Sequence, residues 1–359
     1  MKHPDPLIQE TLDVWMPRFL NGGIHYYDIQ KATGRMKSWD DWGPEWTKMA
    51  EMHEALAEEA WQAGRRISSV QAFQTAARYY HMAYFIYTRD PEVHDRGLRK
   101  MLECYDRILG YMEPSVEKVT IPFEDTFFVG LFSRPKTESP PPVVIFIPGL
   151  DSTKEGRHNA RGTYMRRGMA VLSIDAPGQG ETSLRLKIRP DYEKSVGAAI
   201  DYLESRADVD VDRVGINGAS LGGYYAPRAA AFEKRVIACV GNCGPFDWSE
   251  VFEIIPQVTR EAYIHYAGAK SREEAFEQSK TMTLKGAAKN ITCPLLIVHG
   301  KQDPLIPWEQ GKRIVDEASS QDKQFILFDE GNHGCNNIQY KAGPLVADWL
   351  AMQLGGTVS

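Results

Sequence analysis

The sequence predicts an α/β protein in which helices precede a doubly wound, mostly parallel sheet. The chain up to about Glu113 reads as helical, with long stretches such as Met49–Ala63 and Ser69–Tyr87 rich in Ala, Glu, Gln and Met and poor in Gly and Pro. After Pro114, short apolar runs alternate with helical segments, the pattern of βαβ units. We therefore expect a helical cap domain at residues 1–113 and a sheet-containing catalytic domain at residues 114–359.

Two long helices are expected in the N-terminal domain. They cover Met49–Ala63 and Ser69–Tyr87, and Gly64 between them is typical of a helix end followed by a turn. Aromatic and apolar residues recur every three or four positions along the second segment. The two segments therefore predict an antiparallel helical hairpin with one face buried.

Strand-like runs follow. They are Val116–Ile121, Phe127–Phe132, Val143–Ile147, Ala170–Ile174, Val214–Ile216, Val236–Val240, Leu295–Val298 and Phe325–Phe328. The first two resemble a hairpin of edge strands, and the third is typical of a strand buried on both faces. Strand signals are absent from about residue 245 to residue 289, so we interpret this stretch as a helical lid inserted over the strand ends.

The composition excludes several classes of function. A net charge of -6 offers nucleic acid no basic surface. Apolar runs are too short to span a membrane, and the first residues lack the layout of a signal peptide, so we expect a cytoplasmic protein. The five cysteines contain no CxxC pair and suit neither a disulfide framework nor a zinc site. We expect reduced thiols, no metal and no cofactor.

Gly218, Ser220 and Gly222 form a GxSxG motif between the strand-like Val214–Ile216 and the helix-like Tyr224–Phe232. This context is the one that a nucleophile elbow requires, because the serine occupies a strained turn between strand and helix whose neighbours must be small. The motif therefore predicts the α/β-hydrolase fold, with Ser220 as the nucleophile.

The partners of a catalytic triad follow in the expected chain order. Asp303 comes after the strand Leu295–Val298, and His333 after the strand Phe325–Phe328. The carboxyl ends of parallel strands lie at one edge of a sheet, where distant residues converge. We expect His333 to be the general base and Asp303 to orient it. His299 and Asp329 are alternatives, but a buried hydrogen-bonded histidine and a solvated turn residue are the commoner roles at such positions.

An oxyanion hole needs two N–H donors aimed at one point. The backbone of Leu221 supplies one, directly after the nucleophile. The second is expected from Leu150, in the loop after the strand Val143–Ile147, although a plain β-turn there is an alternative.

The chain resembles the 2,6-dihydroxypseudooxynicotine hydrolase family and its relatives among polyketide-shortening hydrolases. The residues that carry this resemblance are the tryptophan-bearing N-terminal helices, the loop Gly149–Glu155 (GLDSTKE), the loop Asp175–Glu181, the segment Ser220–Gly223, and His333 with Cys335 and Asn336. GLDSTKE is more specific than GxSxG. Cys335 is expected to be a packing residue beside the site.

The resemblance implies hydrolysis of a carbon–carbon bond next to a ketone, in an aromatic or polyketide-like substrate. Such a reaction expels a carbanion equivalent that needs a proton, and relatives place a glutamate in the lid. Glu250 and Glu253 are the candidates here, although a solvated lid carboxylate is an equally good interpretation. A carboxylesterase, and a hydrolase-fold interaction protein without activity, are the alternative functions.

The resemblance also implies a homodimer, and N-terminal helices that roof the active site. Tyr79, Tyr80 and Tyr84 could then line a pocket for an aromatic substrate, although such residues are more often packed in a core. The expected partner is a small ketone or ester, with neither nucleic acid nor membrane involved.

Overall fold

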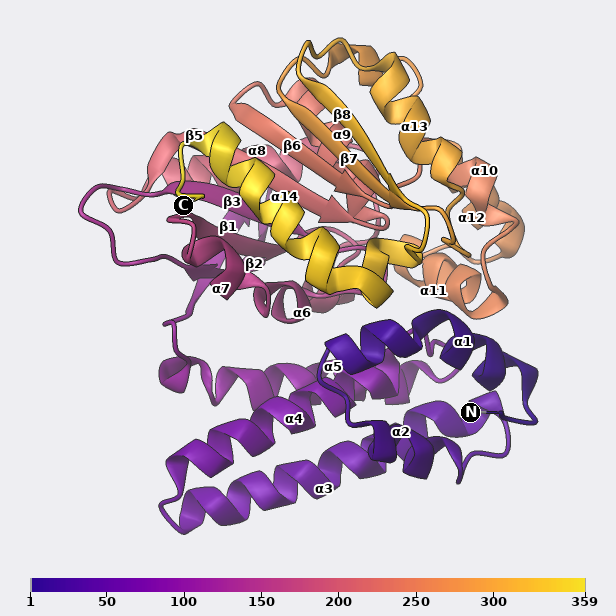
Figure 1. The fold of residues 1–359 in the computed structure, drawn as a ribbon. Coiled ribbons are helices and arrows are strands. Elements are labelled where there is room, and N and C mark those ends of the chain that lie inside the picture. The colour runs from indigo at the N-terminus through magenta and orange to yellow at the C-terminus, as the bar shows by residue number, and fades with distance from the viewer. Residues whose placement is uncertain (1, 359) are drawn as a thin grey trace. The chain divides into compact units, whose positions relative to one another are not determined.

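The computed structural model describes residues 2–358 (Figure 1), and the chain forms two compact units. The first comprises the chain up to Ser115 together with Pro256–His265, and the second comprises Val116–Ile255 with the chain from Tyr266 onward. The lid predicted at residues 245–289 is therefore divided, because residues 256–265 group with the N-terminal helices in the first unit. Within residues 2–358, no helix has the length and apolar character that crossing a bilayer requires.

The first unit is helical. Its helices are α1 (Pro6–Asn21), α2 (Tyr26–Thr33), η1 (Trp39–Asp41), α3 (Trp42–Gln62), α4 (Arg66–Tyr84), α5 (Pro91–Asp106), η2 (Leu109–Tyr111) and most of α11 (Gln257–Ala267).

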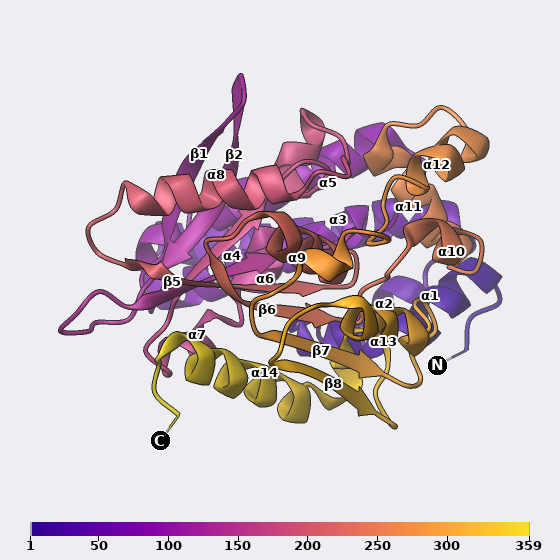
Figure 2. The ribbon, with the colours of Figure 1, turned by 90° about the horizontal axis from the view of Figure 1, so that it is seen from above.

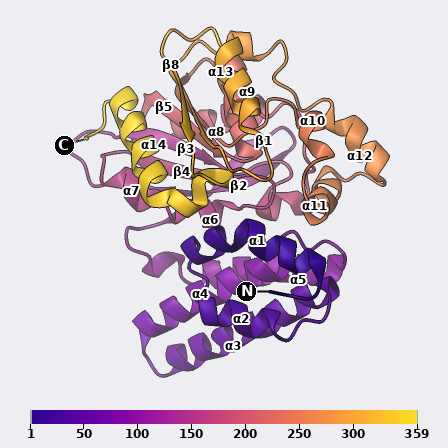
Figure 3. The same ribbon diagram turned by 45° about the vertical axis from the view of Figure 1, so that its right-hand side comes forward.

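The helices α3 and α4 form the expected antiparallel hairpin (Figure 3). Trp42 at the start of α3 donates its indole N–H to the carbonyl of Met82 near the end of α4, and the hydroxyl of Ser69 at the start of α4 donates to the carbonyl of Ala57. Gly64 lies between the helices with φ +75°, a conformation that glycine adopts without steric cost.

The second unit is built on one eight-stranded sheet in the order β1-β2-β4-β3-β5-β6-β7-β8. Its strands are β1 (Glu117–Phe123), β2 (Thr126–Ser133), β3 (Pro142–Ile147), β4 (Ala170–Asp175), β5 (Asp210–Ala219), β6 (Val236–Asn242), β7 (Leu295–Gly300) and β8 (Lys323–Phe328). The strands from β4 to β8 in this order pair in parallel, and β2 pairs antiparallel with both β1 and β4. Only β1 of the expected edge hairpin is therefore an edge strand.

Helices cover both faces of this sheet (Figure 2). On one face lie α6 (Lys154–His158), α7 (Arg161–Met165) and α14 (Gln339–Leu354), and on the other lie α8 (Glu193–Glu204), α9 (Gly222–Phe232) and α13 (Trp308–Glu317). Coverage on both sides explains why β3, β4 and β7 are buried along their whole length and consist mostly of apolar residues. The unit also contains α10 (Trp248–Phe252), α12 (Arg272–Ser279), η3 (Gly180–Leu184), η4 (Ala288–Asn290) and η5 (His333–Ile338).

Candidate active site

Ser220 occupies a sharp turn between β5 and α9. Its φ is +58°, in the left-handed region that residues other than glycine rarely adopt, and such strain is found at functional sites. A Cβ atom on Gly218 would lie 1.8 Å from the carbonyl oxygen of Gly222, and one on Gly222 would lie 2.5 Å from the carbonyl oxygen of Ile147. The glycines of the GxSxG motif are therefore required by the close approach of backbone to backbone.

Asp303 and His333 are hydrogen bonded to each other. Nδ1 of His333 lies 2.7 Å from Oδ2 of Asp303, and Oδ1 of Asp303 accepts the N–H groups of Leu305 at 2.8 Å and Ile306 at 3.0 Å. Burial by itself would raise the pKa of this carboxyl, but His333 and the neighbouring His299 hold the pKa of Asp303 well below its usual value. The carboxylate is therefore ionised and fixed in orientation.

The loop that carries His333 lies close to the turn at Ser220. The N–H of Ser220 donates to the carbonyl of Asn242 at 2.9 Å, and the side-chain amide of Asn242 donates to the carbonyl of Gly334 at 3.4 Å. Two hydrogen bonds thus connect Ser220 to the residue that follows His333. The register of the parallel strands explains this proximity, because β5, β6, β7 and β8 all end at one edge of the sheet.

His299 and Asp329 have the environments that the sequence favours, a buried one for the histidine and an exposed one for the aspartate. His299 is fully buried, with Nε2 3.0 Å from the carbonyl of Ile306 and 3.5 Å from Oδ2 of Asp303. Asp329 is exposed and forms an ion pair with Lys301. The structure therefore places His299 behind the acid of the proposed triad and Asp329 in solvent.

The loop after β3 runs directly past Ser220. A Cβ atom on Gly149 would lie 3.0 Å from Cβ of Ser220 and 3.4 Å from its Oγ. Leu150, the next residue, is buried, and so is Leu221 immediately after Ser220. The two backbone segments expected to supply the oxyanion donors therefore flank Ser220.

Cys335 is buried in the apolar core of the second unit, as is Cys243. Burial raises the pKa of the Cys243 thiol well above its usual value, which disfavours the reactive thiolate. These contacts suit a packing role beside the site.

Both lid glutamates form ion pairs with arginines. The carboxylate of Glu250 accepts from Arg313 at 2.6 Å and from Gln310 at 2.7 Å, and that of Glu253 accepts from Arg272. Their side chains are 45% and 47% exposed. These contacts lie among the lid and α13, and a role for either glutamate in protonating the leaving group stays a prediction.

The three tyrosines considered for a pocket are buried in the helical unit. The hydroxyl of Tyr79 donates to Asp28 at 2.6 Å, that of Tyr80 donates to Glu54 at 2.5 Å, and that of Tyr84 lies 2.8 Å from Nδ1 of His81. Burial raises the pKa of both Tyr79 and Tyr80. The observed contacts describe packing within the unit, and a role in a pocket stays a prediction.

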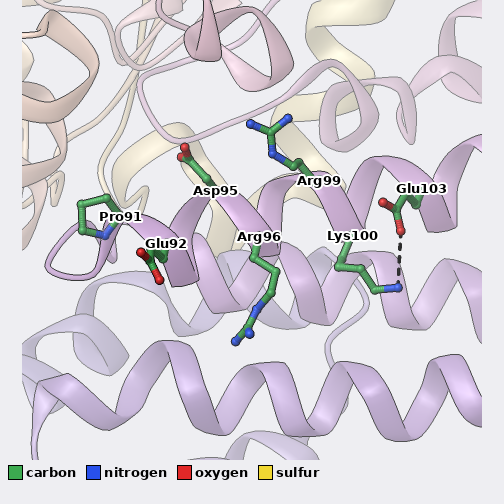
Figure 4. Close-up of a pocket in the computed structure, with 7 residues that line it drawn as sticks. All are labelled: Pro91, Glu92, Asp95, Arg96, Arg99, Lys100 and Glu103. Atoms are coloured by element: carbon green, nitrogen blue, oxygen red, sulfur yellow. Dashed lines mark hydrogen bonds and ion pairs between the residues drawn. The ribbon is translucent and has the colours of Figure 1, made fainter.

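Residues suited to metal binding gather at two places in the described chain. His94, Asp95 and His265 bring ligand atoms within 4.8 Å of one another in the first unit, and Cys243, His299 and Asp303 do so in the second. The second set includes the acid of the proposed triad, so an ion there would compete with His333. Asp95 also lines a hollow of about 450 Å³ along α5, whose seven lining residues lie between Pro91 and Glu103 (Figure 4).

Sequence reasoning missed the buried charges around Lys154. This lysine is fully buried and lies within ion-pair distance of Glu155, Asp175 and Glu181. A lysine beside a glutamate in the loop that follows β3 was the available signal, but nothing in the sequence indicates that both side chains turn inward.

Comparison with known proteins decides the family. A model of the prolyl oligopeptidase family of peptidases matches residues 158–357. The chain belongs to this family. It has the α/β-hydrolase fold and is a hydrolase, as the sequence analysis predicts.

Similarity to individual relatives indicates which branch of the family the chain resembles. The chain is 28% identical to 2,6-dihydropseudooxynicotine hydrolase of Paenarthrobacter nicotinovorans over 93% of this chain and 90% of that one. A crystal structure of 2,6-dihydroxy-pseudo-oxynicotine hydrolase matches with a TM-score of 0.85, 28% identity, and coverage of 96% of this chain and 97% of that one. The 20-hydroxy-prefusarin hydrolase of Gibberella moniliformis is 34% identical over 64% of this chain and 58% of that one. These relatives support the resemblance drawn from GLDSTKE.

Proposed function

We propose that this hydrolase cleaves a carbon–carbon bond next to a ketone, in an aromatic or polyketide-like substrate, through Ser220, His333 and Asp303. The observation that carries the nucleophile assignment is the strained φ of Ser220 in the turn after β5, and the hydrogen-bonded pair of Asp303 and His333 supports the other two roles. The similarity to 2,6-dihydropseudooxynicotine hydrolase along nearly the whole chain supports the substrate class.

The reaction begins when neutral His333 accepts the proton of the Ser220 hydroxyl and Oγ attacks the ketone carbon. The N–H groups of Leu150 and Leu221 stabilise the oxyanion that forms. Collapse of this intermediate breaks the carbon–carbon bond and expels an enolate or a phenyl carbanion equivalent, which takes a proton as it leaves. Water activated by His333 then hydrolyses the acyl-enzyme and releases a carboxylic acid, which restores Ser220.

Protonation of the leaving carbon is the demanding step, because an ester expels an alkoxide that needs less assistance. Glu250 and Glu253 each form an ion pair with an arginine and are partly exposed, which is typical of solvated lid carboxylates. This observation favours carboxylesterase activity as the second candidate function. In the carbon–carbon reaction, the proton that His333 accepts from Ser220 then passes to the leaving carbon.

A substrate panel tests the proposal. Purified protein is incubated with acylphenols, 1,3-diketones and aryl esters, and products are identified by mass spectrometry. From the acylphenols and the 1,3-diketones we expect a carboxylic acid together with a phenol or a methyl ketone. If only the esters are hydrolysed, the protein is a carboxylesterase and the proposal is wrong. The Glu250→Gln and Glu253→Gln variants separate the two further, since ester cleavage should survive both changes.

Labelling tests the nucleophile directly. A fluorophosphonate probe should label the wild-type protein and fail to label Ser220→Ala. Absence of label on the folded wild-type protein would instead favour an interaction protein with an inert site. The predicted homodimer is a separate proposal, which light scattering on the purified protein tests through the measured mass.

A further inference from the structure

The loop that carries Leu150 is attached at both ends to a second loop, residues 175–181, which follows β4. At its start, the carbonyl of Pro148 accepts a hydrogen bond of 2.6 Å from the side-chain amide of Gln179. The oxygen of the same amide is also hydrogen bonded. Oε1 of Gln179 accepts from the N–H of Ala176 at 3.1 Å and from the hydroxyl of Tyr192 at 2.8 Å. Gln179 is 1% exposed, so its three hydrogen bonds are shielded from water.

The far end of the loop is held by Lys154. Its backbone N–H donates to Oδ1 of Asp175 at 2.7 Å, and its ammonium donates to Oδ2 of the same carboxylate at 3.1 Å. Glu155 at 2.7 Å and Glu181 at 3.0 Å complete the shell around the ammonium. Asp175 therefore binds both the backbone and the side chain of one residue, which fixes the position and the direction of the chain at Lys154.

Between these two attachments the loop has little freedom. Gly149 lies so close to Ser220 that even a Cβ atom would approach the serine to 3.0 Å. Thr153 accepts the N–H of Gly156 and so caps the short helix α6. The position of the Leu150 N–H relative to Ser220 is consequently set by the two attachments.

We propose that Gln179 and Lys154 are positioning residues that hold the Leu150 N–H in the oxyanion hole, by attaching its loop to residues 175–181 at both ends. This inference rests on the proposed function. It assigns a role to the Asp175–Glu181 loop and to the lysine of GLDSTKE, neither of which contacts the reacting atoms.

Stability alone is a poor explanation for the charged cluster. Burying a lysine with three acidic side chains carries a large desolvation penalty, and well-packed apolar residues of similar volume are often at least as stabilising. What a buried ion cluster with several hydrogen bonds does supply is a fixed geometry. An oxyanion donor needs this property, since its contribution depends on being aimed before the reaction begins.

The first test uses Gln179→Leu with Gln310→Leu as a matched control. Gln310 is also buried, and its side chain also makes three hydrogen bonds, accepting from the N–H groups of Phe246 and Asp247 and donating to Glu250. Both variants lose an equivalent set of bonds in the same unit, but only Gln179 contacts the oxyanion loop. Thermal unfolding verifies that each variant is folded.

The readout is the inhibition constant of a trifluoromethyl ketone matched to the substrate, divided by KM. This inhibitor forms a tetrahedral adduct with the serine, so its affinity depends on the oxyanion hole more than KM does. Loss of one oxyanion donor costs about 100- to 1000-fold in rate, so a displaced donor should raise the ratio by about 10- to 100-fold in Gln179→Leu. In Gln310→Leu we expect it to stay within about twofold.

Tyr192→Phe provides a second variant that keeps the shape of the core. It removes one hydrogen bond to Gln179, so the ratio should rise by a smaller factor, about two- to fivefold. A folded Gln179→Leu whose ratio matches that of Gln310→Leu would overturn the inference. Failure of the proposed function is distinguishable, because it would appear in the wild-type protein as the absence of both serine labelling and hydrolysis.

Discussion

Oδ2 of Asp303 lies 2.7 Å from Nδ1 of His333, across a separation of 30 residues in the sequence. The opposite oxygen of the carboxylate accepts two backbone N–H groups, so Asp303 cannot rotate away from the imidazole without losing both. A histidine bonded in this way through Nδ1 directs its other nitrogen outward from the acid. The arrangement favours the tautomer that a general base requires.

Replacement of Asp303 by asparagine should therefore abolish most activity while preserving the fold. The amide has nearly the size of the carboxylate but favours the wrong histidine tautomer and cannot stabilise the imidazolium. We expect kcat to fall by about 10⁴-fold. Steady-state kinetics measures the loss, with circular dichroism as the control for folding, and a decrease of less than tenfold would contradict the assignment of the acid.

His299→Leu should lower stability and affect catalysis indirectly. The change leaves the buried carbonyl of Ile306 without the imidazole N–H, at a cost of about 1–3 kcal/mol in the free energy of unfolding. It also removes one of the groups that keep the pKa of Asp303 low, so that pKa should rise. Since a depressed carboxyl pKa contributes stability that is lost only as the pH falls, the variant should become acid-sensitive at a higher pH than the wild type.

Urea unfolding over a series of pH values measures this effect. His299→Gln is the matched control, because the glutamine amide can still donate to Ile306. If both variants show the wild-type pH dependence, His299 does not support the carboxylate of Asp303.

Two glycine substitutions should have different consequences. A Cβ atom on Gly218 would collide with the backbone of Gly222 at 1.8 Å, so Gly218→Ala should prevent the elbow from forming and yield little folded protein. On Gly149 the closest approach is 3.0 Å, which a small shift of the loop relieves. Gly149→Ala should therefore fold, but with kcat reduced by about 10-fold or more as the oxyanion donor moves. Soluble yield and kcat distinguish the two outcomes, and a fully active Gly218→Ala would contradict the elbow geometry.

Asp175→Asn should change how stability depends on pH. Burial, with the nearby Glu155 and Glu181, raises the pKa of Asp175 from 3.8 to about 7 against the opposing effect of Lys154. Between these values the folded protein retains a proton that the unfolded chain releases, so this contribution is fully present at low pH and is lost as the pH rises through about 7.

Compared with Asp175→Asn, the wild-type protein should therefore lose stability between pH 5 and pH 7.5, by an amount on the order of 2 kcal/mol. Urea unfolding of both proteins at the two pH values provides the comparison. Parallel stability curves would mean that Asp175 stays ionised throughout and that Lys154 neutralises it.

The sequence by itself determined the strands, their alternation with helices, and the order of serine, acid and histidine. These features are local. Apolar runs such as Val143–Ile147 must be buried on both faces, and GxSxG between a strand and a helix allows few other conformations. The family of the chain and its fold followed from the same residues.

Only the tertiary structure decided which charges lie inside the protein. Nothing in the sequence marks Lys154 and Glu155 as buried, yet both turn inward, and Asp175 at the end of β4 lies within ion-pair distance of Lys154. The lid glutamates Glu250 and Glu253, by contrast, stay partly exposed, and each is paired with an arginine from another helix. Partners of this kind are brought together by chain packing over long sequence separations, which no local pattern encodes.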